Sequence, residues 1–315
     1  MATNNSADIA TGAIGTVLTG NGVGVAPTFQ IATANTSFVG GRLSLVSGVP
    51  VTTTDQLAAT TLYYVPYLGE NMDLYSGSAW VNFQLTQLSI AIPATTNHNY
   101  DAFMQYNAGT PQLSLTAWTN QTTRSTSLAY QNGVLVLSGT PTSRYLGTIA
   151  TTGVSGQTED SVANRFVWNY YNRATRKMLV TESTADWLLP ASSSWRQANA
   201  NAANQLNFVC GVVEDVVNAT ISVTAYSAGG NALATVGVDL DSTSVVSTTC
   251  INAYGSIPNN AAQQITAFYS GYTGIGVHYL AWLENSANGS TTHMSAASAI
   301  STGNPYCGIS GVILG

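Results

Sequence analysis

Residues 125–139 read STSLAYQNGVLVLSG, and this stretch decides the fold class of the chain. Asn132-Gly133 lies between two apolar runs, which is the strongest short-range signal for a β-hairpin with a two-residue turn. Residues 72–85, MDLYSGSAWVNFQL, place Ser-Gly-Ser between two alternating runs in a similar way. Both stretches predict antiparallel strands that are joined by short turns.

The composition of the whole chain also favours β-structure. Charged residues make up 7% of the 315 residues, whereas they make up about a quarter of a typical soluble chain. Thr, Ser, Asn and Gln replace them, and Thr, Val and Tyr suit a strand better than a helix. With 29 Gly and 9 Pro available for turns, the chain is predicted to be all-β. A nearly uncharged surface has little self-repulsion, so it is compatible with packing against further copies of itself.

Strand signals and composition divide the chain into three parts. Residues 1–40 are small, polar and glycine-rich, so they cannot bury enough apolar surface to fold alone and are predicted to form an extended N-terminal anchoring arm. Residues 41–200 are predicted to form a β-rich meander or sandwich, and residues 201–315 a C-terminal, jelly-roll-like β-sandwich. One turn of helix is expected at Thr158, and a loop-rich junction is expected at residues 182–205.

The segment 158–180 holds four of the eight basic residues, namely Arg165, Arg173, Arg176 and Lys177. We interpret these four as a subunit-contact charge cluster, in which the pairs form within the chain or between subunits. The candidate acidic partners are Glu159, Asp160, Glu182 and Asp186. A patch for an anionic partner is the second interpretation.

The glycine-rich stretch at residues 12–30, GAIGTVLTGNGVGVAPTFQ, raises the question of a phosphate site. A P-loop needs Lys and a Ser or Thr after its second glycine, but Gly20 is followed by Asn21 and Gly22. Pro27 argues against the helix that a dinucleotide fingerprint requires. We expect the glycines to let an extended backbone pass close to another protein, because Gly brings no side-chain clash. The expected anchoring residues are Val17, Leu18, Val25 and Phe29.

Charge and hydropathy exclude several kinds of partner. The net charge is −6 and the pI about 4.8, so no nucleic-acid partner is expected. No apolar run approaches the roughly 18–20 residues of a membrane span, so no membrane partner is expected. No Lys or Arg precedes Arg42; a secretory n-region is therefore not visible, and synthesis in a cytosol is expected. The three cysteines are too few and too scattered for a disulfide framework.

No pattern of catalytic residues is visible, so neither enzymatic activity nor a cofactor or metal is expected. GxSxG and HExxH motifs are missing from the sequence, and these are the motifs that mark a nucleophile elbow and a zinc protease. Asp239 and Asp241 fit a hard cation by type, but solvated turn residues are the favoured interpretation. The 16 Tyr and 6 Trp are expected in the core and in subunit interfaces, with a glycan site as the alternative, because exposed aromatic rings stack on sugars.

The order of short motifs along residues 11–200 resembles bacteriophage fibre proteins. The stretch TGAIGTVLTGNGVGVAPTFQ is similar to their N-terminal segments, and residues 40–80, from GGRLSLV to LYSGSAW, are similar to a module of tail-fibre and head-fibre proteins. The pattern continues in order through AWTNQTTR, QNGVLV, RYLGT, TEDS and RFVWNYYNRATRKM. Residues 206–315 match more loosely, mainly through GVHYLAWLE.

This resemblance implies a virion structural protein, a homotrimer that is anchored by its N-terminus and points a β-rich head outward. We expect a capsid decoration or head-fibre (cement) protein on the surface of the phage particle, made in the host cytoplasm. Through residues 1–40 it would contact the major capsid protein or another virion protein, and host surface glycans are a further expected partner. A tail fibre or receptor-binding protein is the alternative. A polysaccharide-cleaving tailspike and a cellular adhesin are less favoured, and the shared motifs carry no catalytic residues.

Overall fold

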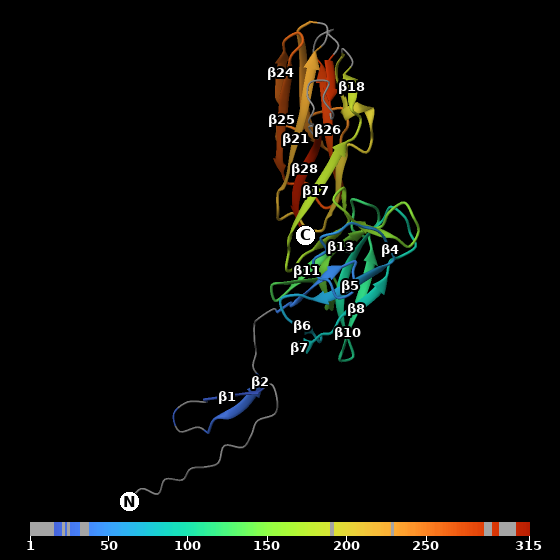
Figure 1. Cartoon of the computed structure of the whole chain (residues 1–315). Coiled ribbons are helices and arrows are strands. Elements are labelled where there is room, and N and C mark those ends of the chain that lie inside the picture. Colours follow the sequence, from blue (N-terminus) through green and yellow to red (C-terminus); the bar gives the residue numbers. More distant parts are fainter. Residues whose placement is uncertain are drawn as a thin grey trace, which may run out of the picture.

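The computed structural model describes residues 16–20, 23, 26–31, 38–189, 192–227, 230–286, 292–295 and 307–315. In these residues the regular secondary structure consists of strands and one 3-10 helix, η1 (Ala198–Ala200). The predicted all-β class is therefore confirmed. Figure 1 shows two β-rich bodies, which we call the lower body and the upper body after their places in the picture, and an N-terminal hairpin that is drawn apart from both.

A six-stranded antiparallel sheet forms the centre of the lower body (Figure 1). Its strands are β9 (Asn99–Asn107), β10 (Thr110–Ala117), β11 (Leu128–Gln131), β12 (Val134–Leu137), β13 (Thr140–Ala150) and β16 (Val167–Asn169). The hairpin predicted at Asn132-Gly133 is confirmed, since it joins β11 to β12. Asn132 and Gly133 have φ angles of 51° and 84°, and positive φ at both central residues is what a type I′ turn requires.

Two smaller sheets complete the lower body. One contains β3 (Gly41–Ser44), β5 (Thr61–Pro66) and β8 (Leu88–Ala91), and the other contains β6 (Asn71–Tyr75) and β7 (Trp80–Gln84). The second predicted hairpin is also confirmed, because β6 and β7 pair with Tyr75 opposite Trp80. Side chains from these sheets and from the six-stranded sheet share one apolar cluster, which includes Leu43, Leu62, Met72, Met104 and Ile149. Burial of this cluster holds the three sheets together.

The upper body is built from two larger sheets. The seven-stranded sheet contains β17 (Thr175–Glu182), β18 (Asp186–Leu189), β21 (Val217–Ser227), β23 (Cys250–Ile251), β25 (Ala262–Gly271), β27 (Thr292–Ser295) and β28 (Cys307–Leu314). The eight-stranded sheet contains β4 (Gln56–Ala59), β14 (Thr158–Asp160), β15 (Asn164–Arg165), β19 (Ser192–Gln197), β20 (Gln205–Cys210), β22 (Ala232–Leu240), β24 (Ala253–Ile257) and β26 (Gly276–Ser286). Ile221 of the first sheet and Val236 and Trp282 of the second belong to one buried cluster, so the two sheets share a core.

The sheets of the upper body draw strands from both sides of residue 200. β17 pairs with β28, β18 with β27 and β19 with β26. β15 pairs in parallel with β20, and through β14 the same sheet reaches β4, which lies in the lower body in Figure 1. The segments 41–200 and 201–315 are therefore joined by shared sheets as well as by the chain.

Two local expectations are wrong. The helical turn expected at Thr158 is a strand, because Thr158–Asp160 form β14 with Thr158 opposite Ala59. The loop-rich junction expected at residues 182–205 contains β18, β19 and η1. In β18, Trp187 and Leu189 are buried while the residues between and before them are exposed, which is the period-two pattern of a half-buried strand.

The expected N-terminal arm contains a hairpin. β1 (Thr16–Thr19) pairs antiparallel with β2 (Thr28–Ile31), and Leu18 lies opposite Phe29. The boundary of the lower body begins before residue 41, because Val39 bridges to Met72 and the Phe38 N–H donates to Oδ2 of Asp73 at 2.9 Å. Among the described residues, no helix has the length and apolar character needed to cross a membrane.

Candidate functional site

Asp160 lies between two arginines that sequence analysis had placed in one charge cluster. Its Oδ1 accepts a hydrogen bond from Nη1 of Arg165 at 2.9 Å, and its Oδ2 accepts one from Nη2 of Arg176 at 2.6 Å. All three side chains are buried. Arg165 also donates to the carbonyl of Lys177 and Arg176 to that of Thr52. Burial lowers the pKa of Arg176, although the carboxylate of Asp160 opposes that shift.

Arg173 makes a second in-chain network. Its guanidinium pairs with the carboxylates of Glu214 and Asp215, and its Nε donates to the carbonyl of Tyr170 at 3.1 Å. The guanidinium carbon lies 4.8 Å from the ring centroid of Trp168, which is within the range of a cation–π contact. Burial opposes the charged form, but the two carboxylates raise the pKa of Arg173. The network attaches the loop between β20 and β21 to the segment that precedes β17.

Arg124 is held in a third network, next to the second. Nε and Nη2 of Arg124 bind Asp101 at 2.7 and 3.2 Å, and Nη2 also donates to the carbonyl of Gly211 at 2.5 Å. The guanidinium carbon is 4.6 Å from the ring centroid of Trp118 and 5.5 Å from that of Tyr145. Burial disfavours the charge, yet the bond to Asp101 raises the pKa of Arg124. The guanidinium is therefore charged and fixed in orientation at neutral pH.

A groove of about 460 Å³ opens beside Arg124, between the lower and the upper body. We call it the Tyr130 groove. Its lining comes from β11, β12, the loop that precedes β11 and the two loops that follow β20 and β25, namely Arg124, Ser127, Leu128, Tyr130, Leu135, Val212, Val213, Glu214 and Ile275. The ring of Tyr130 is 68% exposed, and the side chain of Glu214 is 43% exposed.

The Tyr130 groove combines an apolar floor with a few fixed polar groups. Nη1 of Arg124 has no hydrogen-bond partner among the residues that the structure describes, so it can donate to a ligand. Glu214 offers carboxylate oxygens, of which Oε2 is paired with Arg173. Apolar surface with a small number of convergent polar groups is typical of small-molecule sites. An exposed tyrosine beside hydroxyl-binding groups fits the apolar face and the hydroxyls of a sugar ring.

The four basic residues of the predicted cluster do not form one group. Arg165 and Arg176 bind the predicted partner Asp160, whereas Arg173 binds Glu214 and Asp215 instead. Of the other predicted partners, Glu182 accepts hydrogen bonds from Asn201, Asn204 and the Thr184 backbone, and Glu159 accepts them from Ser161 and Asn164. Lys177 is exposed on β17. The pairs that the structure describes are thus formed within the chain.

The predicted anchoring residues lie in or near the N-terminal hairpin. Leu18 is in β1 and is 44% exposed. Val17 and Phe29 are placed in β1 and β2 by their backbone only, and Val25 lies outside the described residues. Their role as anchors stays a prediction.

Other polar residues offer little chemistry. Burial raises the pKa of the Cys210 thiol to about 11, so it carries no thiolate at neutral pH. His278 Nδ1 lies 2.7 Å from Oδ2 of Asp241, and burial raises the pKa of the neighbouring Asp239. Among the described residues, no three His, Cys, Asp or Glu side chains group closely enough to hold a metal ion.

Sequence reasoning did not single out Arg124 or Tyr130. The partners of Arg124, Asp101 and Gly211, are 23 and 87 residues away from it, so no local pattern connects them. The one available signal is the stretch AWTNQTTRSTSLAY, in which a single arginine stands between Trp118 and Tyr130 in a chain that has few charges.

No protein-family model matches the chain, and no curated protein matches it either. Among solved structures, the chain is similar to the insecticidal delta-endotoxin Cry8Ea1 of Bacillus thuringiensis, with 8% identity, a TM-score of 0.26, and coverage of 87% of this chain and 51% of the toxin. A Cry1Da tryptic core variant from the same organism gives 7% identity, a TM-score of 0.22, and coverage of 82% and 48%. An exo-beta-1,3-galactanase from Phanerochaete chrysosporium gives 11% identity, a TM-score of 0.17, and coverage of 81% and 66%.

The chain thus spans about half the length of these toxin structures. At these TM-scores the likeness carries no argument about fold or function.

Proposed function

We propose that this chain is a structural protein of a bacteriophage particle, a trimeric capsid decoration or head-fibre protein that is made in the host cytoplasm. Its N-terminal residues attach to the major capsid protein or to another virion protein. The two β-rich bodies point outward and contact glycans on the host surface. The trimer, the virion partner and the jelly-roll character of the upper body belong to this proposal.

The observation that supports the proposal most is the separation of the N-terminal hairpin from the rest of the chain. Figure 1 draws β1 and β2 apart from both bodies, and the hairpin precedes a lower body that has its own apolar core. A two-stranded hairpin by itself is only marginally stable in water, so packing on another surface would stabilise it. Leu18, exposed in β1, is one side chain that such packing would bury.

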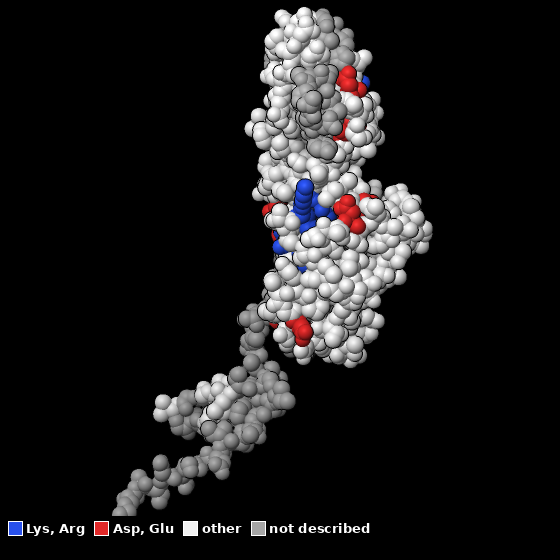
Figure 2. Space-filling model, in the orientation of Figure 1, with Lys and Arg blue, Asp and Glu red and all other residues white. Residues whose placement is uncertain are grey.

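The outer surface supports the same proposal. In Figure 2 most of the visible surface carries neither acidic nor basic side chains, and several of the charged groups gather where the two bodies meet. Such a surface has little self-repulsion, so many copies can stand close together on one particle. Many copies also turn weak sugar contacts at the Tyr130 groove into useful avidity.

Particle assembly with a shortened chain tests the attachment. The deletion should remove residues 1–31, because Phe38 and Val39 already bind Asp73 and Met72 of the lower body. We expect the shortened chain to fold with an unchanged melting temperature and to be missing from purified particles. Normal incorporation of the shortened chain would contradict attachment through this segment.

The Tyr130 groove favours a second candidate, a tail fibre or receptor-binding protein, because a ligand groove between two bodies suits receptor recognition. A low-resolution map of the particle separates the two. Density at the capsid three-fold positions supports the decoration protein, and density only at the tail supports the fibre.

A further inference from the structure

One face of the seven-stranded sheet points to solvent and is nearly free of charge. We call it the β21 face and define it by the outward residues of β17, β28, β21, β25 and β23. Alternation along β21 is regular, with Ala219, Ile221 and Val223 buried and the residues between them at least partly exposed. Among the described outward residues of these strands, Lys177 is the only charged one.

The strand register brings these outward residues into rows across the sheet. In one row Ile251, Phe268, Thr220 and Ser310 are direct neighbours on β23, β25, β21 and β28. The adjacent row contains Ser270, Asn218, Val312 and Lys177, which lie on β25, β21, β28 and β17. Directly opposed residues on one face of a sheet have neighbouring side chains, so the apolar and hydroxyl groups form one continuous surface.

Large apolar side chains on this face are exposed. Phe268 is 51% exposed, Ile251 71%, Val312 39% and Leu314 37%. Phe268 and Ile251 are neighbours across β25 and β23, and Val312 and Leu314 are successive outward residues of β28. Single exposed apolar residues are ordinary on a protein surface, but grouped ones mark interaction sites, so these two pairs are candidates for burial by another protein surface.

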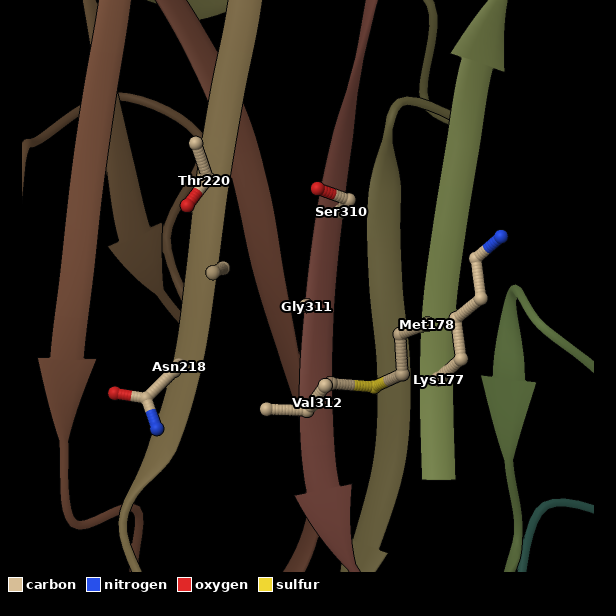
Figure 3. Close-up of a pocket in the computed structure, with 8 residues that line it drawn as sticks. Lys177, Met178, Asn218, Thr220, Ser310, Gly311 and Val312 are labelled. Atoms are coloured by element: carbon tan, nitrogen blue, oxygen red, sulfur yellow. The ribbon is translucent and has the colours of Figure 1, made fainter. Parts of the chain in front are cut away.

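Hollows lie beside these protruding side chains. One of about 350 Å³ lies over β17, β28 and β21. Figure 3 shows Ser310 and Val312 on the middle strand, Asn218 and Thr220 on the strand to their left, and Lys177 on the strand to their right. Two more of about 210 and 200 Å³ adjoin it, and Asn218 lines all three. A surface that carries both protruding rings and side-chain-sized hollows can interlock with a copy of itself.

We propose that the β21 face packs against a second copy of this chain, an inference that rests on the trimer in the proposed function and names the surface that forms it. An uncharged face meets a copy of itself without like-charge repulsion. Among the described outward residues of these strands a charged partner would find Lys177 alone, because Asp215 in the adjoining hollow is paired with Arg173. Lys177 lies on β17, where its long side chain can keep the ammonium in water at the rim of the contact.

The size of the face agrees with this occupant. β21 and β25 are paired over ten residues, from Val217 and Gly271 to Tyr226 and Ala262. The five strands hold 39 residues, so at ~3.4 Å per residue and ~4.8 Å per strand the face covers roughly 640 Å². Stable interfaces bury roughly 600–1,000 Å² on each partner. Around a three-fold axis the β21 faces of three copies can point inward, so that each face meets the other two.

Sedimentation equilibrium of the full chain tests the proposal, with Ser310→Arg as the main variant. Ser310 is exposed, so the arginine adds bulk and charge to the face without touching the core. We expect the wild type to form a discrete oligomer and Ser310→Arg to dissociate at least about tenfold more readily. Phe268→Asp is a second variant with the same expected direction.

Leu57→Asp is the matched control. Leu57 is 65% exposed on β4, outside the β21 face, and we expect this variant to keep the wild-type mass. Thermal melting checks that each variant is folded. A monomeric wild type, or an oligomer that both face variants leave intact, would overturn the inference. An oligomer that survives both face variants would refute the β21 contact but not the proposed virion role. Normal incorporation of the chain that lacks residues 1–31 would refute attachment through that segment but not the β21 contact.

Discussion

Charged side chains are distributed differently in two regions of the molecule, the junction of the two bodies and the β21 face. At the junction, Asp160 is buried between Arg165 and Arg176, whereas Lys177 is the single charge among the described residues of the face. Arg42 and Arg144 follow the first pattern, since both are buried and donate to backbone carbonyls such as those of Gly315 and Asp73. Several of the eight basic residues of the chain are thus buried and bind carboxylates or backbone carbonyls of the same chain.

We expect the first region to determine the stability of the single chain and the second to determine how copies of the chain associate. Buried arginines are expected to hold the sheets of one chain together, while the surface that is left uncharged is expected to hold copies of the chain to one another. Each of the following substitutions should change either the stability of the chain or its binding to another molecule, and leave the other property unchanged.

The largest effect is expected from Asp160→Ala. Removing the carboxylate leaves Arg165 and Arg176 buried without their shared partner, and breaking a buried ion pair from one side costs about 3–5 kcal/mol. The free energy of unfolding, measured by urea denaturation, should fall by that amount. Glu70→Ala is the control, because the side chain of Glu70 binds only the exposed Gln84 among the described contacts and its removal should change stability by less than about 0.5 kcal/mol. A loss below about 1 kcal/mol for Asp160→Ala would contradict the role of the junction.

A smaller and pH-dependent effect is expected from Glu182→Gln. Hydrogen bonds from Thr184, Asn204 and Asn201 outweigh the opposing effect of burial and lower the pKa of Glu182 to about 2. A lowered pKa in the folded state adds stability that is fully present above the ordinary value of about 4.5 and is lost as the pH falls through about 2. The stability difference between wild type and Glu182→Gln should therefore be constant from pH 7 to pH 5 and shrink below pH 4. A difference that grows on acidification would be inconsistent with this account.

The third effect concerns only association. Ser310→Arg should weaken the oligomer while it changes the unfolding free energy of the monomer by less than about 0.5 kcal/mol, because Ser310 is an exposed residue. Urea denaturation at low protein concentration, below the dissociation range, measures the second quantity. A large loss of monomer stability would show that the face is part of the fold of a single chain.

The smallest effect on the fold is expected from Tyr130→Ala. The ring is 68% exposed in the groove, so its loss should leave both stability and mass unchanged. If the groove binds sugars by stacking, affinity for host lipopolysaccharide or capsule saccharide should fall about 5–10-fold, as measured by isothermal titration. Leu57→Asp serves again as a control with unchanged affinity. Equal saccharide affinity of wild type and Tyr130→Ala would rule out the Tyr130 groove as the glycan-binding site.

The sequence was informative where structure depends on neighbouring residues. Asn132-Gly133 and Ser76-Gly77-Ser78 predicted two hairpins that are present, because the turn chemistry is local. The Arg165–Asp160 pair was predictable for the same reason, since its members are five positions apart in the sequence. Strands β18 and β19 were missed, since their partner residues in β27 and β26 lie 86 to 109 positions away and no local signal identifies them.

The candidate sites depended on long-range contacts and were less predictable. Arg173 was expected to pair with nearby acids but binds Glu214 and Asp215, more than 40 residues away. The Tyr130 groove forms because β11 and the loop after β20 lie side by side. These segments are far apart in the sequence, so no local pattern predicts that they meet. The β21 face likewise requires strands from four separate segments in one register.

The most direct test of the central claim measures the mass of the chain in solution for two variants side by side. By sedimentation equilibrium at one protein concentration, Asp160→Asn should keep the oligomeric mass of the wild type although it unfolds at lower urea concentration. Ser310→Arg should show the monomer mass although it unfolds like the wild-type monomer. If instead Asp160→Asn dissociates while folded and Ser310→Arg stays assembled, the charged residues of the junction form the subunit contact and the account is wrong.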